Sequence, residues 1–249
     1  MPKLLQASSL ANMTRFVLSA LAALAISSSL FGNIKLRIAV ASNFHQTLSK
    51  ITEAYQNAHP EIEITLIPGS SGKLYAQIAN GADFDAFFSA DSERPQKLEA
   101  DKIAQSGSRF TFALGILAFW QPGSAPACFQ NTQTLALANP KLAPFGAAAA
   151  EASGKLPFPT HRAVTSASVS QAFTFAQSGA ADSAFVSYSQ LLQRGIPTEE
   201  FILVDSALYS PISQQAIALN AKPKLLDFLA FCQGPEARNL IAAAGYHIP

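Results

Sequence analysis

The sequence has little charge and almost no cysteine. Only 13% of its 249 residues are charged whereas 49% are hydrophobic, a balance that excludes a disordered chain and argues against a solvated coiled coil. Its 17 Lys and Arg residues against 16 Asp and Glu leave a net charge of +1, so no overall field draws the protein to nucleic acid or to an anionic membrane. The two cysteines, Cys128 and Cys232, exclude a disulfide scaffold and a multi-cysteine metal site. The sequence leaves open whether they pair.

The sequence also lacks a hydrophobic run long enough to cross a membrane. Its first apolar run, residues 16–26, is shorter than the about 20 residues that a spanning helix needs. Met13, Thr14 and Arg15 precede this run and three serines follow it, which is the order of a secretory signal. We therefore predict a cleaved signal peptide over residues 1–33 rather than a permanent anchor, with Met13 as an alternative start. The mature protein is then expected in the periplasm.

Strand patterns and helix patterns alternate through the rest of the chain. Apolar or alternating stretches at residues 36–41, 61–67 and 84–88 predict strands, and helical patterns follow them. Such units form mostly parallel sheets that are covered on both faces. Further strands are predicted at 110–120, 135–138, 163–165, 184–187, 201–204 and 213–219, and further helices at 146–152, 169–178, 223–232 and 235–244.

The order of these elements predicts an α/β fold with two lobes, each a mostly parallel sheet flanked by helices. Because the last helices can return to pack on the first lobe, the chain crosses between the lobes twice. We expect lobe 1 to comprise residues 34–113 and 206–249, and lobe 2 to comprise residues 114–205. The crossings are expected near residues 110–113 and 204–209.

Small polar residues follow three of the predicted strands at the points where helices begin. These corners are Ser42-Asn43, Ser70-Ser71-Gly72 and Ser166-Ala167-Ser168. A helix start carries unpaired N–H groups and about half a positive charge, and ligands of open parallel sheets bind at the carboxyl ends of the strands. If the corners converge, they predict a site for a small oxyanion. Taken one at a time, each corner is also compatible with an ordinary helix cap.

Other chemistries find weaker support in the sequence. Ser70 and Lys73 form the Ser-x-x-Lys pattern of serine acyl enzymes, but the Lys-Thr-Gly or Lys-Ser-Gly partner of that pattern is missing. The four histidines are scattered without metal-ligand spacing. Three aspartates flank or follow one predicted strand, and we expect them to cap rather than to catalyse; they are Asp83, Asp85 and Asp91.

The longest motif resembles a known family. The run GSSGKLYAQI at residues 69–78, continuing through Asn80-Gly81-Ala82 to Phe88-Ser89-Ala90-Asp91, is similar to the periplasmic molybdate-binding protein of ABC transporters. Residues 39–44, AVASNF, resemble the first ligand loop of that family. Shorter similarities lie at 136–146, 169–172, 234–238 and 245–246, so that the resemblance covers Ile34 to Pro249.

The resemblance implies a two-lobed fold of the periplasmic-binding-protein type II, whose cleft closes on molybdate or tungstate. By position it implies contacts from Ser42, Asn43, Ser71, Phe145 and Val169. Phe145 and Val169 have no side-chain donor, so they have to act through backbone N–H groups, as the helix-start interpretation requires. Ser187 stands where some members of the family place a tyrosine hydroxyl, and the roles of Ser187 and of neighbouring Tyr188 are left open.

A site built from neutral donors selects its ligand by size and protonation rather than by charge alone. A desolvated dianion needs about six or seven hydrogen bonds of the charge-assisted kind. We therefore predict an exported solute-binding protein without a catalytic residue or a cofactor. Its partners are expected to be a small oxyanion and an ABC permease, with no nucleic acid, and the protein is expected to be a monomer. The alternatives are a carrier of sulfate or another small oxyanion and, from a different class, an exported serine acyl enzyme.

Overall fold

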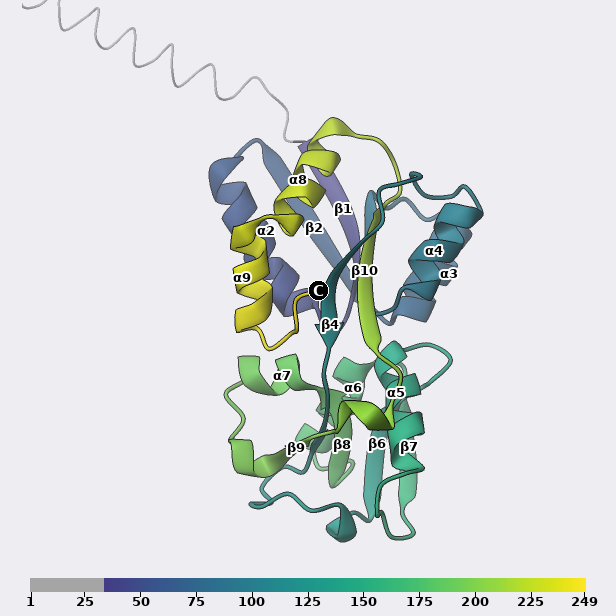
Figure 1. The fold of residues 1–249 in the computed structure, drawn as a ribbon, viewed down its shortest axis with the longest axis vertical. Helices are drawn as coiled ribbons and strands as arrows, with labels where there is room; N and C mark the ends of the chain where they lie inside the picture. The colour runs from purple at the N-terminus through teal and green to yellow at the C-terminus, as the bar shows by residue number, and fades with distance from the viewer. Residues whose placement is uncertain (1–33) are drawn as a thin grey trace, which may run out of the picture.

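The computed structural model describes residues 34–249, so the predicted signal peptide lies outside the described residues. The chain forms two five-stranded sheets, which lie one above the other in Figure 1. The strand order is β2-β1-β3-β10-β4 in the upper sheet, sheet A, and β7-β6-β8-β5-β9 in the lower sheet, sheet B. Among the described helices none is both long and apolar enough to cross a membrane.

The helices and strands have the following bounds. Sheet A contains β1 (Ile34–Ala41), β2 (Ile62–Gly69), β3 (Ala86–Ser89), β4 (Phe110–Gly115) and β10 (Ile212–Ala218). Sheet B contains β5 (Leu117–Trp120), β6 (Thr134–Ala138), β7 (Arg162–Ser166), β8 (Ser183–Ser187) and β9 (Phe201–Leu203). The helices are α2 (His45–Ala58), α3 (Ser71–Ala79), α4 (Glu93–Ala100), α5 (Pro144–Ser153), α6 (Val169–Gln177), α7 (Tyr188–Gln193), α8 (Pro223–Gln233) and α9 (Pro235–Ala243).

In each sheet one strand runs against the other four. β1 pairs in parallel with β2 and β3, whereas β10 is antiparallel to both β3 and β4. In sheet B, β6 pairs in parallel with β7 and β8, whereas β5 is antiparallel to β8 and β9. The predicted α/β fold with two lobes and mostly parallel sheets is confirmed.

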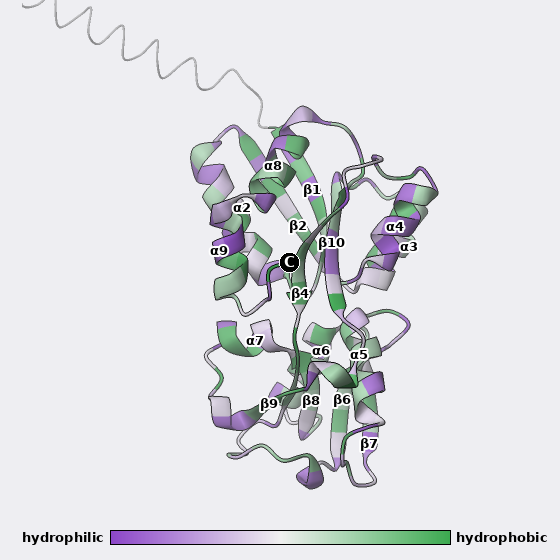
Figure 2. Ribbon diagram, viewed as in Figure 1, coloured by the Kyte–Doolittle hydropathy of each residue, from purple (hydrophilic) through white to green (hydrophobic). Residues whose placement is uncertain are grey.

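The alternation of side chains along β1 divides the core of the upper lobe in two. Ile38 and Val40 belong to the cluster under α2, α8 and α9, and Ala39, between them, belongs to the cluster under α3 and α4. Figure 1 shows these two sets of helices on opposite sides of sheet A. In Figure 2 the strands are largely hydrophobic, whereas the outer helix α4 is mostly hydrophilic, as expected of a helix with one buried stripe.

The predicted strand at residues 110–120 is wrong, because this segment forms two strands in different sheets. β4 ends at Gly115 and β5 begins at Leu117, so the chain crosses from sheet A to sheet B at Ile116. Both halves are buried in their own sheets, which is why the apolar run shows no break. The chain returns between Leu203 and Ile212.

We propose the expected boundaries for the lobes, with residues 34–113 and 206–249 in lobe 1 and residues 114–205 in lobe 2. The division of the strands between the sheets supports them, although β4 continues to Gly115.

The structure also answers the question left open for the cysteines. Cys128, in lobe 2, and Cys232, buried in lobe 1, are both free.

The expected capping role is seen at Asp91, whereas Asp85 binds the backbone of a strand rather than a helix end. Asp91 Oδ1 accepts the N–H of Arg94 in the first turn of α4, at 3.1 Å, although the cap position itself is Ser92. The buried Asp85 carboxylate accepts the N–H of Arg37 at 2.7 Å. Both carboxylates therefore hold backbone in place.

Candidate functional site

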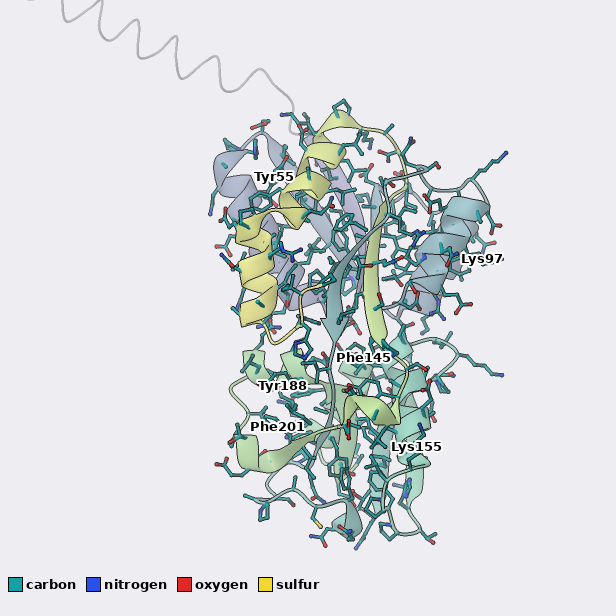
Figure 3. The ribbon with its side chains drawn as sticks, viewed as in Figure 1. Tyr55, Lys97, Phe145, Lys155, Tyr188 and Phe201 are labelled. Atoms are coloured by element: carbon teal, nitrogen blue, oxygen red, sulfur yellow. The ribbon has the colours of Figure 1, made fainter. Side chains whose placement is uncertain are left out.

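Two of the three polar corners, Ser42-Asn43 and Ser70-Ser71, line one hollow between the lobes, and the third corner reaches it only through the helix start at Val169. The hollow is small, with a volume of about 10 Å³. Its lining is formed by Ala41, Ser42, Asn43, Gly69, Ser70, Ser71, Ala90, Ala143, Pro144, Phe145 and Val169. The structure thus brings all five residues of the predicted ligand set together, and Figure 3 labels Phe145 at the level where the lobes meet.

Three helices begin at this hollow. Ser71 is the first residue of α3 in lobe 1, Val169 is the first residue of α6 in lobe 2, and Phe145 follows Pro144 at the start of α5. The first N–H groups of a helix have no partner within the helix, and each helix start adds a partial positive charge. The three starts therefore direct N–H donors from both lobes toward the same point.

The hydroxyl groups of two adjacent serines face the same hollow. Ser71 Oγ accepts the N–H of Ala90 at 2.9 Å, which leaves its own proton free to be donated to a ligand. Ser70 Oγ is buried and has no hydrogen-bond partner among residues 34–249. A buried polar atom without a partner is costly. Both hydroxyls are therefore suited to a bound polar group.

Ser42 and Asn43 offer different donors to the hollow. The N–H of Ser42 donates to Gly69 O at 2.9 Å, so Ser42 has only its hydroxyl to offer. The carboxamide of Asn43 is already committed, because its Nδ2 donates to Gln214 Oε1 at 2.8 Å and to Tyr246 Oη at 3.2 Å. The donor of Asn43 that is left for a ligand is therefore its backbone N–H rather than its side chain.

Among residues 34–249, no charged side chain lines the hollow. Arg194 lines a second cavity of about 450 Å³ that shares Ser42 and Asn43 with the hollow. His45 lines the same cavity. Burial lowers the pKa of His45, so this imidazole is neutral at pH 7. The recognition of a ligand in the hollow thus depends on neutral donors.

Hydrogen bonds join the lobes on both sides of the hollow. On the side of α3 the N–H of Gly72 donates to Leu142 O at 2.8 Å, and on the side of α2 Gln193 Nε2 donates to Thr47 Oγ1 at 3.1 Å. Ser170 Oγ, in the first turn of α6, donates to Ser42 O at 3.1 Å. The lobes are therefore in contact around the hollow.

The arrangement does not support the chemistry of an acyl enzyme. Ser70 is buried whereas Lys73 is exposed to solvent and does not line the hollow. A nucleophilic serine needs a base within hydrogen-bond reach, and Ser70 Oγ has no partner in the part of the chain that the structure describes. Within residues 34–249, His, Cys, Asp and Glu side chains form no group of three or more that could hold a metal ion.

Several residues that surround the site were not predicted from the sequence. Ser70 lies in the same corner as Ser71, so its place in that corner could have indicated that it lines the site. The loop of Ser42 and Asn43 is hydrogen-bonded by side chains that do not line the hollow, namely Ser170, Gln214 and Tyr246. Ser187 and Tyr188, whose roles were left open, do not line the hollow, and Ser187 Oγ lies 3.2 Å from Ser189 Oγ.

The fold and the hollow define a two-lobed binding protein. Comparison with known proteins gives the family. The chain belongs to the bacterial extracellular solute-binding proteins, whose family matches residues 36–247.

Two curated relatives are more than a third identical to this chain over the aligned residues. The molybdate-binding protein ModA of Azotobacter vinelandii is 36% identical over 85% of this chain and 89% of its own length. ModA of Rhodobacter capsulatus is 37% identical over 84% of this chain and 86% of its own length. Both relatives are named as molybdate-binding proteins.

Solved structures show the same architecture. The periplasmic molybdate-binding protein of Azotobacter vinelandii superposes with a TM-score of 0.76, at 33% identity, over 86% of this chain and 99% of that one. The sulfate-binding protein SubI of Mycobacterium tuberculosis superposes with a TM-score of 0.70 at 12% identity, over 86% of this chain and 87% of that one. The second likeness shows the fold alone.

Proposed function

We propose that this protein captures molybdate, or the similar anion tungstate, in the hollow between its lobes and presents it to an ABC permease. One observation carries the proposal: three helix starts and the Ser71 hydroxyl, drawn from both lobes, meet at a small hollow whose lining has no charged side chain. The names of the two curated relatives support the choice of anion. We further propose that the protein acts as a monomer in the periplasm.

The donors are proposed to replace the hydration shell of the anion. They are the hydroxyls of Ser42 and Ser71 and the N–H groups of Asn43, Ser71, Phe145 and Val169. A hydrogen bond to a charged group stabilises binding by about 1.5 to 3 kcal/mol. A helix dipole contributes less, about 0.3 to 1 kcal/mol. The number of donors therefore matters more than the helix charge. Backbone donors are also fixed in place, so they lose little entropy on binding.

The same donor set explains which anions are expected to be rejected. The lining contains no carboxylate, so a monoprotonated anion such as hydrogen phosphate finds no charged acceptor for its proton. Sulfate has no such proton, and it differs from molybdate mainly in being smaller. We therefore expect selection against phosphate by protonation and against sulfate by size. No catalytic step and no cofactor are part of this function.

Closure of the lobes is proposed to follow from the position of the donors. Ser71 belongs to lobe 1, whereas Phe145 and Val169 belong to lobe 2, so an anion that contacts all three binds the closed form better than an open form. The ligand then shifts the population toward closure. The closed form is the state that we expect the permease to recognise.

A carrier of sulfate or another small oxyanion is the second candidate, and the experiment that tests the proposal separates the two. The mature chain is titrated calorimetrically with molybdate, tungstate, sulfate and phosphate. We expect molybdate and tungstate to bind and to raise the melting temperature, and sulfate and phosphate to bind weakly or not at all. Sulfate binding as tight as molybdate binding would overturn the assignment. A covalent mass shift on Ser70 with an acylating probe would instead support an acyl enzyme.

A further inference from the structure

The hydroxyl of Tyr246 is buried where the C-terminal segment meets both lobes. Tyr246 follows α9 and is only 4% exposed. Its Oη donates to Asn43 O at 2.9 Å and accepts from Asn43 Nδ2 at 3.2 Å. It also accepts from Ser189 Oγ at 2.8 Å. These bonds use the donor and both acceptor sites of the hydroxyl.

The partners of this hydroxyl belong to different lobes. Asn43 lies in the loop of lobe 1 that lines the hollow, whereas Ser189 lies in α7 of lobe 2. Ser189 is itself 1% exposed and contacts Ser187 Oγ at 3.2 Å. Breaking the bond between Ser189 and Tyr246 by opening the lobes would leave buried polar groups to be rehydrated. The bond therefore favours the closed arrangement of the lobes.

The backbone around Tyr246 holds the hydroxyl at the junction of the lobes. His247 exchanges two backbone hydrogen bonds with Leu114 of β4, at 2.8 and 3.1 Å, beside the crossing to sheet B. Gly245 has a positive φ of 86°, which favours glycine. A Cβ there would lie 3.0 Å from the ring of Tyr188 and 3.1 Å from Leu192, so α7 packs directly on this segment.

Tyr246 also fixes the orientation of a ligand donor. The carbonyl and the carboxamide of Asn43 are both bonded to Tyr246 Oη, and the carboxamide is bonded to Gln214 as well. The donor of Asn43 that remains is its N–H, the group proposed to contact the anion. Burial raises the pKa of Tyr246 to about 12. The hydroxyl therefore keeps the proton that it donates to Asn43 throughout the neutral pH range.

We propose that Tyr246 is a positioning residue that couples the ligand loop of lobe 1 to lobe 2 through Ser189. Closure of the lobes and alignment of the Asn43 N–H are then one event, which the anion completes without touching Tyr246. This coupling rests on the proposed function, because it assumes that Asn43 contacts the bound anion.

The test uses Tyr246→Phe, Ser189→Ala and the double variant, each in the full mature chain. We expect each single variant to bind molybdate about 3- to 10-fold more weakly, the effect of one lost neutral hydrogen bond, with the ratio of molybdate to sulfate affinity unchanged. The double variant is expected to be no weaker than Tyr246→Phe, because both substitutions remove the same bond. Tyr55→Phe is the matched control, because Tyr55 Oη is buried in lobe 1 and has no partner among the described residues.

A second readout reports the lobes without any ligand. Spin labels at Lys97→Cys in lobe 1 and Glu199→Cys in lobe 2, in a Cys128→Ser background, give the distance between the lobes. Both labelled positions are exposed. We expect Tyr246→Phe and Ser189→Ala to shift the ligand-free distribution toward longer distances, and Tyr55→Phe to leave it unchanged.

The outcomes separate failure of the coupling from failure of the proposed function. Additive losses in the double variant, or an unchanged distance distribution, would overturn the coupling even if molybdate binds. If the parent protein binds none of the anions, the proposed function fails, and a longer ligand-free distance in the variants would still show that Tyr246 joins the lobes. Should Tyr246→Phe prove unfolded by its melting curve, Ser189→Ala tests the same bond from lobe 2.

Discussion

At the scale of single residues, Ser71 offers two donors to the hollow. Its hydroxyl oxygen is occupied by the N–H of Ala90, so its proton is available to the anion. We predict that Ser71→Ala weakens molybdate binding by about 1.5 to 3 kcal/mol, the value of a hydrogen bond to a charged group. Calorimetry measures the loss. Ser178→Ala, which removes an exposed hydroxyl at the end of α6, is the control. Equal affinities for the two variants would remove Ser71 from the ligand set.

Ser170 acts on the same loop from the other lobe. Its hydroxyl donates to Ser42 O, and in a planar trans peptide this carbonyl points opposite to the N–H of Asn43. We predict that Ser170→Ala lowers molybdate affinity by about 0.5 to 1.5 kcal/mol, because the donor is less well aligned. Thr174→Ala, one turn further along α6, should leave the titration curve unchanged. A loss of the same size in both variants would point to damage of the helix rather than of the loop.

The corners that line the hollow at Ser42-Asn43 and Ser70-Ser71 could be predicted from the sequence because each is a local junction between a strand and a helix, whereas Phe145 was implied only by the resemblance to the family. The contacts that hold those corners could not be predicted. Asn43 and Tyr246 are 203 positions apart, and Ser189 reaches the same hydroxyl from a different lobe. No periodicity or spacing in the sequence connects such residues, since only the fold brings them together.

At the scale of elements, Gly146 sets the distance between α5 and sheet B. A Cβ at this position would lie 2.3 Å from Ala138 O, a backbone atom that cannot rotate away. We predict that Gly146→Ala displaces the start of α5, lowers the melting temperature and weakens anion binding through Phe145. Gly154, at the end of the same helix, is the control position, because the atom nearest to a Cβ there would lie 3.9 Å away. Gly154→Ala should therefore melt and bind like the parent. Normal binding by Gly146→Ala would show that α5 tolerates the shift.

Two errors of the sequence prediction, one at a strand and one at a helix, have physical reasons. The run at 110–120 is apolar throughout because β4 and β5 are buried in different sheets, and a change of sheet leaves no mark in hydropathy. α7 has only six residues, too few to show a helical period. Its start did carry a signal, because Ser187 and Gln190 have the spacing of a capping box and Gln190 Oε1 accepts the N–H of Ser187.

At the scale of the whole molecule, the buried Asp85 carboxylate links distant parts of lobe 1. It accepts hydrogen bonds from the Arg37 N–H, from Asn220 and from Lys222. Burial raises the pKa of Asp85, but these three bonds outweigh burial and bring the pKa below its ordinary value of 3.8. A carboxylate with a lowered pKa stabilises the fold above its unfolded-state pKa, and this stabilisation is lost as the pH falls through the folded-state pKa.

We therefore predict that the parent protein loses free energy of unfolding as the pH falls below about 4, and that Asp85→Asn removes part of this dependence. At pH 7 the variant should be less stable by about 1 to 3 kcal/mol, because strong hydrogen bonds to the charged carboxylate are lost. Denaturant unfolding at several pH values measures both effects. Asp101→Asn, at an exposed pair with Lys97, should follow the parent at every pH. A parallel pH profile for Asp85→Asn would contradict the prediction.

The order of strands in sheet A has a consequence for how the protein is made. β10 lies between β3 and β4, yet it is the last strand to be synthesised. A nascent chain that ends at Leu203 already contains every strand of sheet B, whereas its sheet A is split in the middle. Lobe 2 can therefore assemble first, and lobe 1 is finished only when nearly the whole polypeptide has been delivered. A truncated product lacking the last forty or so residues would carry an intact lower lobe and an unfinished upper one.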